Sequence, residues 1–60
     1  MCVEVGTMLV DEDGDEWMVR ACSPTSVTLH HHRRGVHRLR RDDLEAWIEA
    51  GRWTVTSSPG

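Results

Sequence analysis

A short acidic loop between two alternating segments constrains the fold of this chain more than any other feature. The loop at residues 12–14 is Glu-Asp-Gly, and it ends in the residue that a type I turn followed by a left-handed conformation requires. In the segments on either side, residues 4–11 and 15–22, the alternate positions from 5 to 9 and from 17 to 21 are all uncharged. We therefore predict an antiparallel hairpin in which Leu9 faces Trp17.

The alternation also predicts which face of this hairpin is buried. Val5, Thr7 and Val19 fall on the same face as Leu9 and Trp17, and none of these five residues is charged. We expect this face to belong to the core.

A second hairpin follows the turn around Pro24. Residues 27–32 and 36–40 are predicted strands, and the loop at 33–35, Arg-Arg-Gly, repeats the glycine-last pattern. This register pairs Leu29 with Leu39 and sets His31 opposite His37.

The last third of the chain predicts a short helix and a closing strand. In residues 41–50, three apolar side chains recur at the i, i+3 and i+4 positions of a helix. Asp42 or Asp43 can cap its start, and Gly51 can end it in the left-handed conformation. Residues 52–56 form the closing strand. The predicted core consists of Val5, Leu9, Trp17, Val19, Val27, Leu29, Leu39, Leu44, Trp47, Ile48, Trp53 and Val55.

Four strands, a helical turn and a fifth strand resemble the SH3-like small barrel, a superfamily that includes Tudor, KOW and Sm-type domains. The resemblance covers roughly residues 4–56. It rests on the element order and on four short motifs: Val5-Gly6-Thr7, Asp13-Gly14, Trp17-x-Val19 and Gly51-x-Trp53. It implies a mainly β fold, a five-stranded small barrel with a short α-helix before the last strand. Because this class supports many unrelated functions, the site must carry the functional argument.

The length of the chain limits it to one small domain. Sixty residues bury only about 60% of the surface of the unfolded chain. We assign residues 1–56 to a single domain and residues 57–60 to a disordered tail. No apolar run exceeds three residues, which predicts no membrane span. No signal-peptide pattern is found, so we expect a cytoplasmic protein whose Cys2 and Cys22 are reduced thiols.

Positive charge is concentrated in one block. Residues 30–41 hold five of the seven basic residues, all arginine, and no acid, although the net charge of the chain is −3. Guanidinium groups bind phosphate and carboxylate through paired hydrogen bonds. We therefore predict a non-catalytic binding module for an anionic partner, either nucleic acid or an acidic protein. The candidate contact residues are Arg33, Arg34, Arg38, Arg40, Arg41, His30 and His32. A sequence pI near 5.7 weighs against a dedicated nucleic-acid binder.

The alternative function uses the other face of the first hairpin. Met8, Val10 and Met18 share this face, and an exposed apolar patch on a small protein favours a protein partner or self-association. This patch is the predicted interface for a homo-oligomer or another protein.

Three further kinds of site receive no support from the sequence. The four histidines have no third ligand of fitting spacing, so we predict no metal site and no cofactor. The acidic loop lacks the spacing of a calcium-binding EF-hand, which favours a solvated hairpin tip. No nucleophile lies beside a base and an orienting acid, so we expect neither an enzyme nor a small-molecule substrate.

Overall fold

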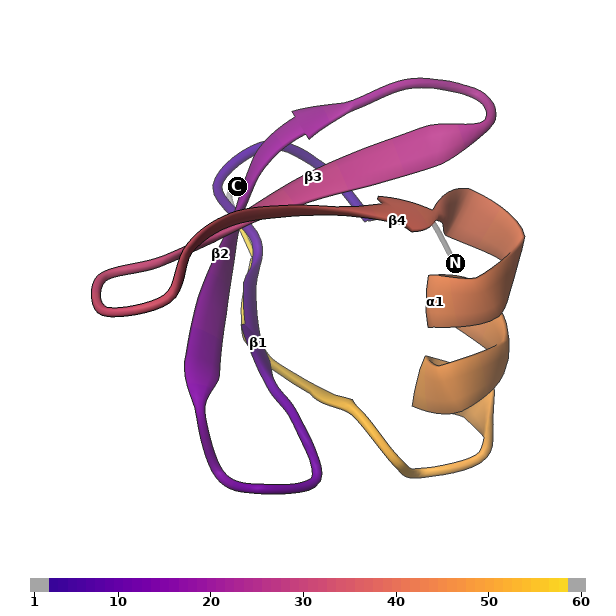
Figure 1. Cartoon of the computed structure of the whole chain (residues 1–60). Coiled ribbons are helices and arrows are strands. Elements are labelled where there is room, and N and C mark those ends of the chain that lie inside the picture. Colours follow the sequence, from indigo (N-terminus) through magenta and orange to yellow (C-terminus); the bar gives the residue numbers. More distant parts are fainter. Residues whose placement is uncertain (1–2, 59–60) are drawn as a thin grey trace.

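The computed structural model describes residues 3–58 as one antiparallel sheet and one helix (Figure 1). The elements are β1 (Met8–Val10), β2 (Glu16–Cys22), β3 (Ser26–His31), β4 (Gly35–Arg40), α1 (Arg41–Glu49) and β5 (Thr54–Ser57). The strands lie in the order β4-β3-β2-β1-β5. The predicted mainly β class and the predicted order of the elements are confirmed.

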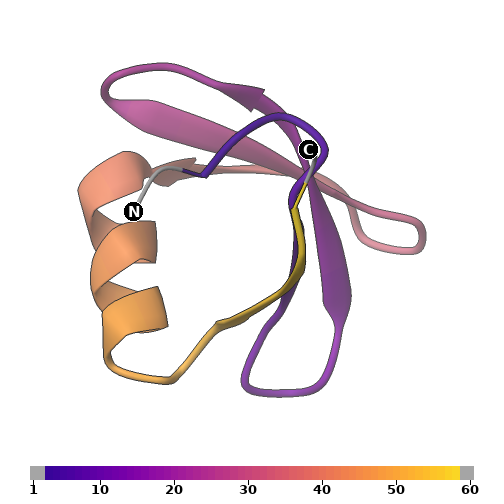
Figure 2. The same cartoon turned by 180° about the vertical axis from the view of Figure 1, so that it is seen from behind.

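The sheet is bent but open. The two strands at the ends of the order, β4 and β5, do not pair with each other. Figures 1 and 2 show α1 leading from the end of β4 toward β5 across this open side. A bulge in β2, where the register shifts between Val19 and Ala21, helps the sheet to turn because bulges bend the strand that contains them. The structure is thus a curled five-stranded sheet, and closure into a barrel is not observed.

The first hairpin has the predicted register. Leu9 faces Trp17, and the Asp11 N–H donates to the carbonyl of Asp15 at 3.0 Å. Gly14 has a φ of 88°, which is the left-handed conformation that the loop requires. The acidic loop therefore sets the pairing of β1 with β2 as its sequence predicts.

The start of β1 corrects the prediction for the N-terminal segment. The Thr7 N–H donates to the carbonyl of Glu4 at 3.0 Å, and Gly6 has a φ of 95°, so residues 4–7 form a turn instead of a strand. As a result Val5 is 56% exposed and not in the core, whereas Val3 is only 2% exposed. The glycine reverses the chain, and Val3 takes the place in the core that the alternation assigned to Val5.

The second hairpin has a different register from the predicted one. Leu39 pairs with Val27 instead of Leu29, and His37 pairs with Leu29 instead of His31. The pairing is displaced by two positions, so each side chain keeps its predicted face. β3 ends at His31 and β4 begins at Gly35, each one residue earlier than predicted, and these two residues face each other.

A buried histidine explains this displacement. The Nδ1 atom of His31 accepts the N–H groups of Arg33 at 3.0 Å and Arg34 at 3.1 Å. These bonds start the turn directly after His31, whose side chain is 4% exposed. Glycine placement alone does not reveal that an imidazole organises the turn.

The helix starts without the predicted cap. The N-cap residue is Arg40, and no side chain among the described residues caps the helix, although Asp42 and Asp43 do lie in its first turn. The N–H of Arg41 instead donates to the carbonyl of Thr25 at 3.1 Å. The turn before β3 thus supplies a backbone acceptor for one of the N–H groups at the start of the helix, which has no side-chain cap.

The end of the helix is as predicted. Gly51 has a φ of 80°, and its N–H donates to the Ile48 carbonyl at 3.1 Å while the Arg52 N–H donates to the Trp47 carbonyl at 2.9 Å. This pair of bonds is a Schellman motif, in which a left-handed glycine closes the helix. The motif turns the chain toward β5, so Arg52 and the residue after it lie beside the helix.

The core lies between the concave side of the sheet and α1. Its buried apolar residues are Val3, Leu9, Trp17, Val19, Val27, Leu29 and Leu44. Five half-buried side chains pack around it, namely Leu39, Trp47, Ile48, Trp53 and Val55. Every predicted core residue except Val5 belongs to one of these two groups.

Two parts of the sequence prediction concern the ends of the chain. β5 includes Ser57, the first residue of the predicted tail, while residues 59–60 and Cys2 lie outside the described residues. Cys22 is exposed and free.

Within residues 3–58, no helix has the length and apolarity needed to cross a lipid bilayer.

Candidate binding surfaces

Four side chains form a row across the outer face of the sheet. Val36 on β4 pairs with His30 on β3, His30 pairs with Met18 on β2, and Met18 pairs with Met8 on β1. Val36 is 53% exposed and Met18 is 40% exposed. We call these four residues the outer row. It contains two members of the predicted apolar interface, and Val36 is an addition to them.

Val10, the third predicted interface residue, lies at the margin of this surface. It is half-buried and pairs with Glu16 on one side and Thr54 on the other. The polar neighbours separate Val10 from any wider apolar area, so the outer row is the main exposed apolar feature of the sheet.

Two of the predicted arginines flank the outer row on β4. Arg38 pairs with Thr28 and Arg40 pairs with Ser26, so both share the outer face with His30. Arg38 donates from Nε to the Oγ of Ser26 at 3.3 Å. Both arginines are exposed.

A further arginine on this face was absent from the predicted set. Arg20 lies at the bulge of β2, opposite the β3 segment that contains Thr28, and it is exposed. The alternation of β2 already placed Arg20 on the face of Met18, which is the signal that could have identified it. Among residues 3–58, the ion pairs do not include Arg20, Arg38 or Arg40. We call these three residues the outer arginines.

The other predicted arginines lie elsewhere. Arg33 and Arg34 are exposed in the turn between β3 and β4, and Arg34 Nη2 lies 3.1 Å from Asp15 Oδ2. Arg41 donates from Nη1 to the Ser23 carbonyl at 2.9 Å and pairs with Glu45 at 3.4 Å. The predicted arginine block therefore does not form one surface, because the hairpin and the helix point its members in three directions.

The histidines divide in the same way. His30 is half-buried in the outer row, whereas His32 is exposed in the turn. The ring of His32 stacks on His31, with centroids 4.9 Å apart and planes inclined by 14°. His31 Nε2 lies 3.5 Å from Asp15 Oδ1. His31 thus connects the tips of the two hairpins, and His32 covers it.

The acidic loop brings three carboxylates together. Asp11, Asp13 and Asp15 each offer an oxygen within 4.8 Å of the others. However, Asp11 Oδ1 accepts the N–H groups of Asp13 and Asp15, both at 2.9 Å, and Asp11 Oδ2 accepts Nε1–H of Trp17 at 3.0 Å. The oxygens of Asp11 are therefore committed to holding the loop against the core.

These contacts shift the acidity of Asp11. Partial burial raises its pKa, but the hydrogen bonds from Trp17 and from the backbone of the loop outweigh burial, and the pKa lies below the usual 3.8. The charged carboxylate is the form that these donors stabilise.

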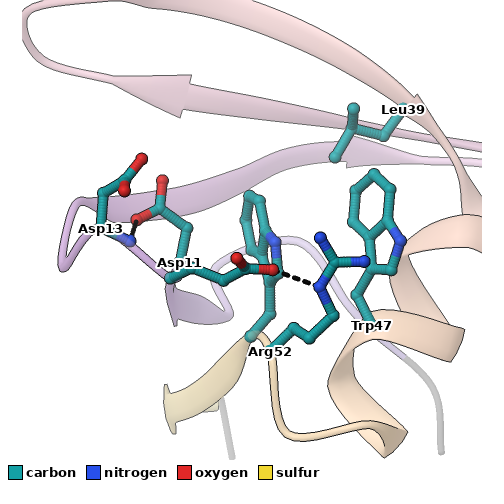
Figure 3. A pocket seen from close by; sticks show the side chains of 7 residues that line it. Asp11, Asp13, Leu39, Trp47 and Arg52 are labelled. Carbon is teal, nitrogen blue, oxygen red and sulfur yellow. Dashed lines mark hydrogen bonds and ion pairs between the residues drawn. The ribbon is translucent and has the colours of Figure 1, made fainter.

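A pocket lies between the tip of the first hairpin and α1 (Figure 3). Its lining residues are Asp11, Glu12, Asp13, Leu39, Trp47, Arg52 and Trp53. The sequence assigned both tryptophans to the core, and they are only half-buried. The pocket was not predicted, because it depends on the Schellman turn carrying Arg52 and Trp53 back toward the acidic loop.

Comparison with known proteins identifies no relative: no family model matches the chain, and neither does any curated protein or solved structure.

Proposed function

We propose that this protein is a non-catalytic binding module that holds an anionic partner on the outer face of its sheet. The observation that carries the proposal is that the outer arginines are exposed beside the outer row and form no ion pair with any residue from 3 to 58. Guanidinium groups on an exposed sheet face can bind carboxylates or phosphates by bidentate hydrogen bonds. The half-buried His30 adds a ring nitrogen to the same surface.

The composition of the surface favours an acidic protein segment as the partner. The outer row supplies an apolar centre, and the outer arginines supply a charged rim, which is the usual organisation of a protein–protein interface. The net charge of −3 opposes the long-range attraction that nucleic-acid binders use. A nucleic acid would engage the arginines but would leave Met18 and Val36 without apolar contacts.

We also propose that the fold is a relative of the SH3-like barrels in which the sheet remains open. The order of five strands with a helix before the last one supports this relation. The opening between β4 and β5 is the feature in which the chain departs from a closed barrel.

The test compares one charge reversal on the outer face with a matched reversal at the hairpin tip. Arg38→Glu and Arg33→Glu change the net charge equally, but only Arg38 lies on the outer face. An acidic, partly apolar peptide and a mixed-sequence DNA duplex serve as probes over a range of salt concentrations. We expect the peptide to bind more weakly as salt rises, and Arg38→Glu to weaken its binding on the order of fivefold, which corresponds to the loss of an exposed ion pair worth about 1 kcal/mol.

Several outcomes would contradict the proposal. Equal losses from Arg38→Glu and Arg33→Glu would mean that only the net charge matters. Binding that is independent of salt, or no binding of either probe at low salt, would exclude the anionic partner. Duplex binding without peptide binding would replace the acidic protein by nucleic acid.

Self-association through the outer row is the second candidate function. The exposure of Met18 and Val36 favours it, since apolar side chains on an uncovered sheet face are suited to a second copy. Light scattering should then report a mass that rises with protein concentration and returns to that of the monomer in Met18→Asp. A constant monomeric mass at high concentration would exclude it.

A further inference from the structure

The pocket beside α1 has aromatic walls. The rings of Trp47 and Trp53 lie 6.0 Å apart between centroids, with planes inclined by 24°. Leu39 completes the apolar lining. Two indoles in this arrangement present electron-rich faces, which attract cations.

The rim of the pocket is acidic. Asp11, Glu12 and Asp13 line it from the loop between β1 and β2, and Figure 3 shows Asp11 and Asp13 on the side opposite Trp47. Arg52 is the only basic residue that residues 3–58 contribute to the lining. The oxygens of Asp11 are occupied by N–H groups of the loop and of Trp17, so Glu12 and Asp13 are the carboxylates available to a ligand.

The chain already places a guanidinium group in this pocket. The Cζ atom of Arg52 lies 5.8 Å from the centre of the Trp47 ring, and its Nε pairs with Glu12, as the dashed line in Figure 3 shows. The side chains of Arg52 and Glu12 are 56% and 49% exposed. An ion pair this exposed is weak. Moving the Arg52 side chain out of the pocket therefore costs little free energy.

We propose that this pocket binds the guanidinium group of an arginine side chain from a protein partner, and that Arg52 occupies the site in the free protein. The incoming group stacks on Trp47 and pairs with Glu12, repeating the two contacts that Arg52 makes. The site is separate from the outer face, since Arg38 and Leu39 are consecutive residues of β4 and point to opposite sides of the sheet.

The charge of the rim selects the source of the ligand. Free arginine carries an α-carboxylate, which the acidic loop repels, and an α-ammonium group, and both charges lose hydration when they approach the pocket. An arginine within a peptide has neutral amides in their place. The planar guanidinium also stacks on an indole face and pairs with a carboxylate at the same time, whereas an ammonium group is a compact point charge.

The test uses capped tripeptides that differ only in the central side chain. Gly-Arg-Gly, Gly-Lys-Gly and the neutral citrulline analogue are titrated into the protein, and the indole N–H signals of Trp47 and Trp53 are followed by NMR into the millimolar range. We expect the arginine peptide to shift both signals, the lysine peptide to bind more weakly, and the citrulline peptide and free arginine to cause little change.

Variants separate binding in the pocket from general attraction. Arg52→Ala removes the internal competitor, so the arginine peptide should bind more tightly, on the order of threefold. Arg52→Gln repeats the test with more of the side chain kept. In the Arg52→Ala background, Glu12→Gln should weaken binding, whereas Glu16→Gln, an equal charge change on β2, should not.

The results that would overturn the proposal are specific. Unmoved indole signals, equal affinity for the arginine and citrulline peptides, or equal affinity for arginine and lysine would each exclude a guanidinium site. Unchanged or weaker binding in both Arg52 variants, with circular dichroism showing a native fold, would exclude Arg52 as the competitor. Equal losses from Glu12→Gln and Glu16→Gln would assign the effect to net charge.

Discussion

Replacement of His31 by alanine is expected to destabilise the protein more than any other change at the hairpin tips. The variant loses the acceptor for the N–H groups of Arg33 and Arg34 and the packing of the imidazole on Trp17, whose ring centroid lies 4.9 Å away. Both arginines are exposed residues, so water can replace the lost acceptor, and each hydrogen bond contributes about 1 kcal/mol. The aromatic contact adds roughly 1 kcal/mol.

The sum, about 3 kcal/mol, is large for a chain of this length. Typical stabilities per residue correspond to about 3–9 kcal/mol for the whole domain, and a loss of this size lowers the melting temperature by roughly 12–24 °C. Thermal unfolding followed by circular dichroism measures the change directly. Faster amide exchange at Arg33 and Arg34 should accompany it.

Two companion variants test the reasoning. His31→Asn keeps a side-chain oxygen that can accept backbone N–H groups of the following residues, so it should recover about half of the loss. His32→Ala removes an exposed ring that stacks on His31 and should cost less than about 1 kcal/mol. If His31→Ala were no more destabilising than His32→Ala, the tip would not depend on His31. If His31→Asn recovered none of the lost stability, the hydrogen bonds to Arg33 and Arg34 would not be the cause of the loss.

Three further predictions concern the core, the helix end and the acidic loop. Leu44→Ala removes the one fully buried side chain of α1 and should lower the free energy of unfolding by about 2–5 kcal/mol. Chemical denaturation should then show a marginally stable or mostly unfolded domain, and a near-native midpoint would contradict this expectation. A Cβ at Gly51 meets nothing within 4 Å, so Gly51→Ala should cost only the left-handed strain, about 1–2 kcal/mol, and a larger loss would point to a missed contact. The lowered pKa of Asp11 means that its carboxylate stabilises the fold above pH 3.8 and that this contribution is lost as the pH falls through the folded pKa. The urea midpoint of the unmodified protein should therefore approach that of Asp11→Asn in acid, and a constant difference would refute the assignment.

The local features of this fold could be predicted because neighbouring residues decide them. Glycine at the end of the first loop requires a left-handed backbone, which fixes the pairing of Leu9 with Trp17. Gly51 ends the helix for the same conformational reason. The inward and outward faces of the strands follow from the period of two, so Met18, Arg38 and Arg40 could be assigned to the outer face before any pairing was known.

The other features depend on groups that meet only in the folded chain. The register of the second hairpin follows from His31, whose role as an acceptor depends on its burial against Trp17. Val3 replaces Val5 because the turn at Gly6 directs the N-terminal segment over the core. Arg52 meets Glu12 only because the helix and its closing turn bring them together across 40 positions of sequence. The sequence by itself determined the loop of the first hairpin, the alternation and the helix end, since their energies are local. Tertiary structure decided the pairing of the second hairpin, the open sheet and the aromatic pocket, because the contacts that stabilise these join residues far apart in the chain.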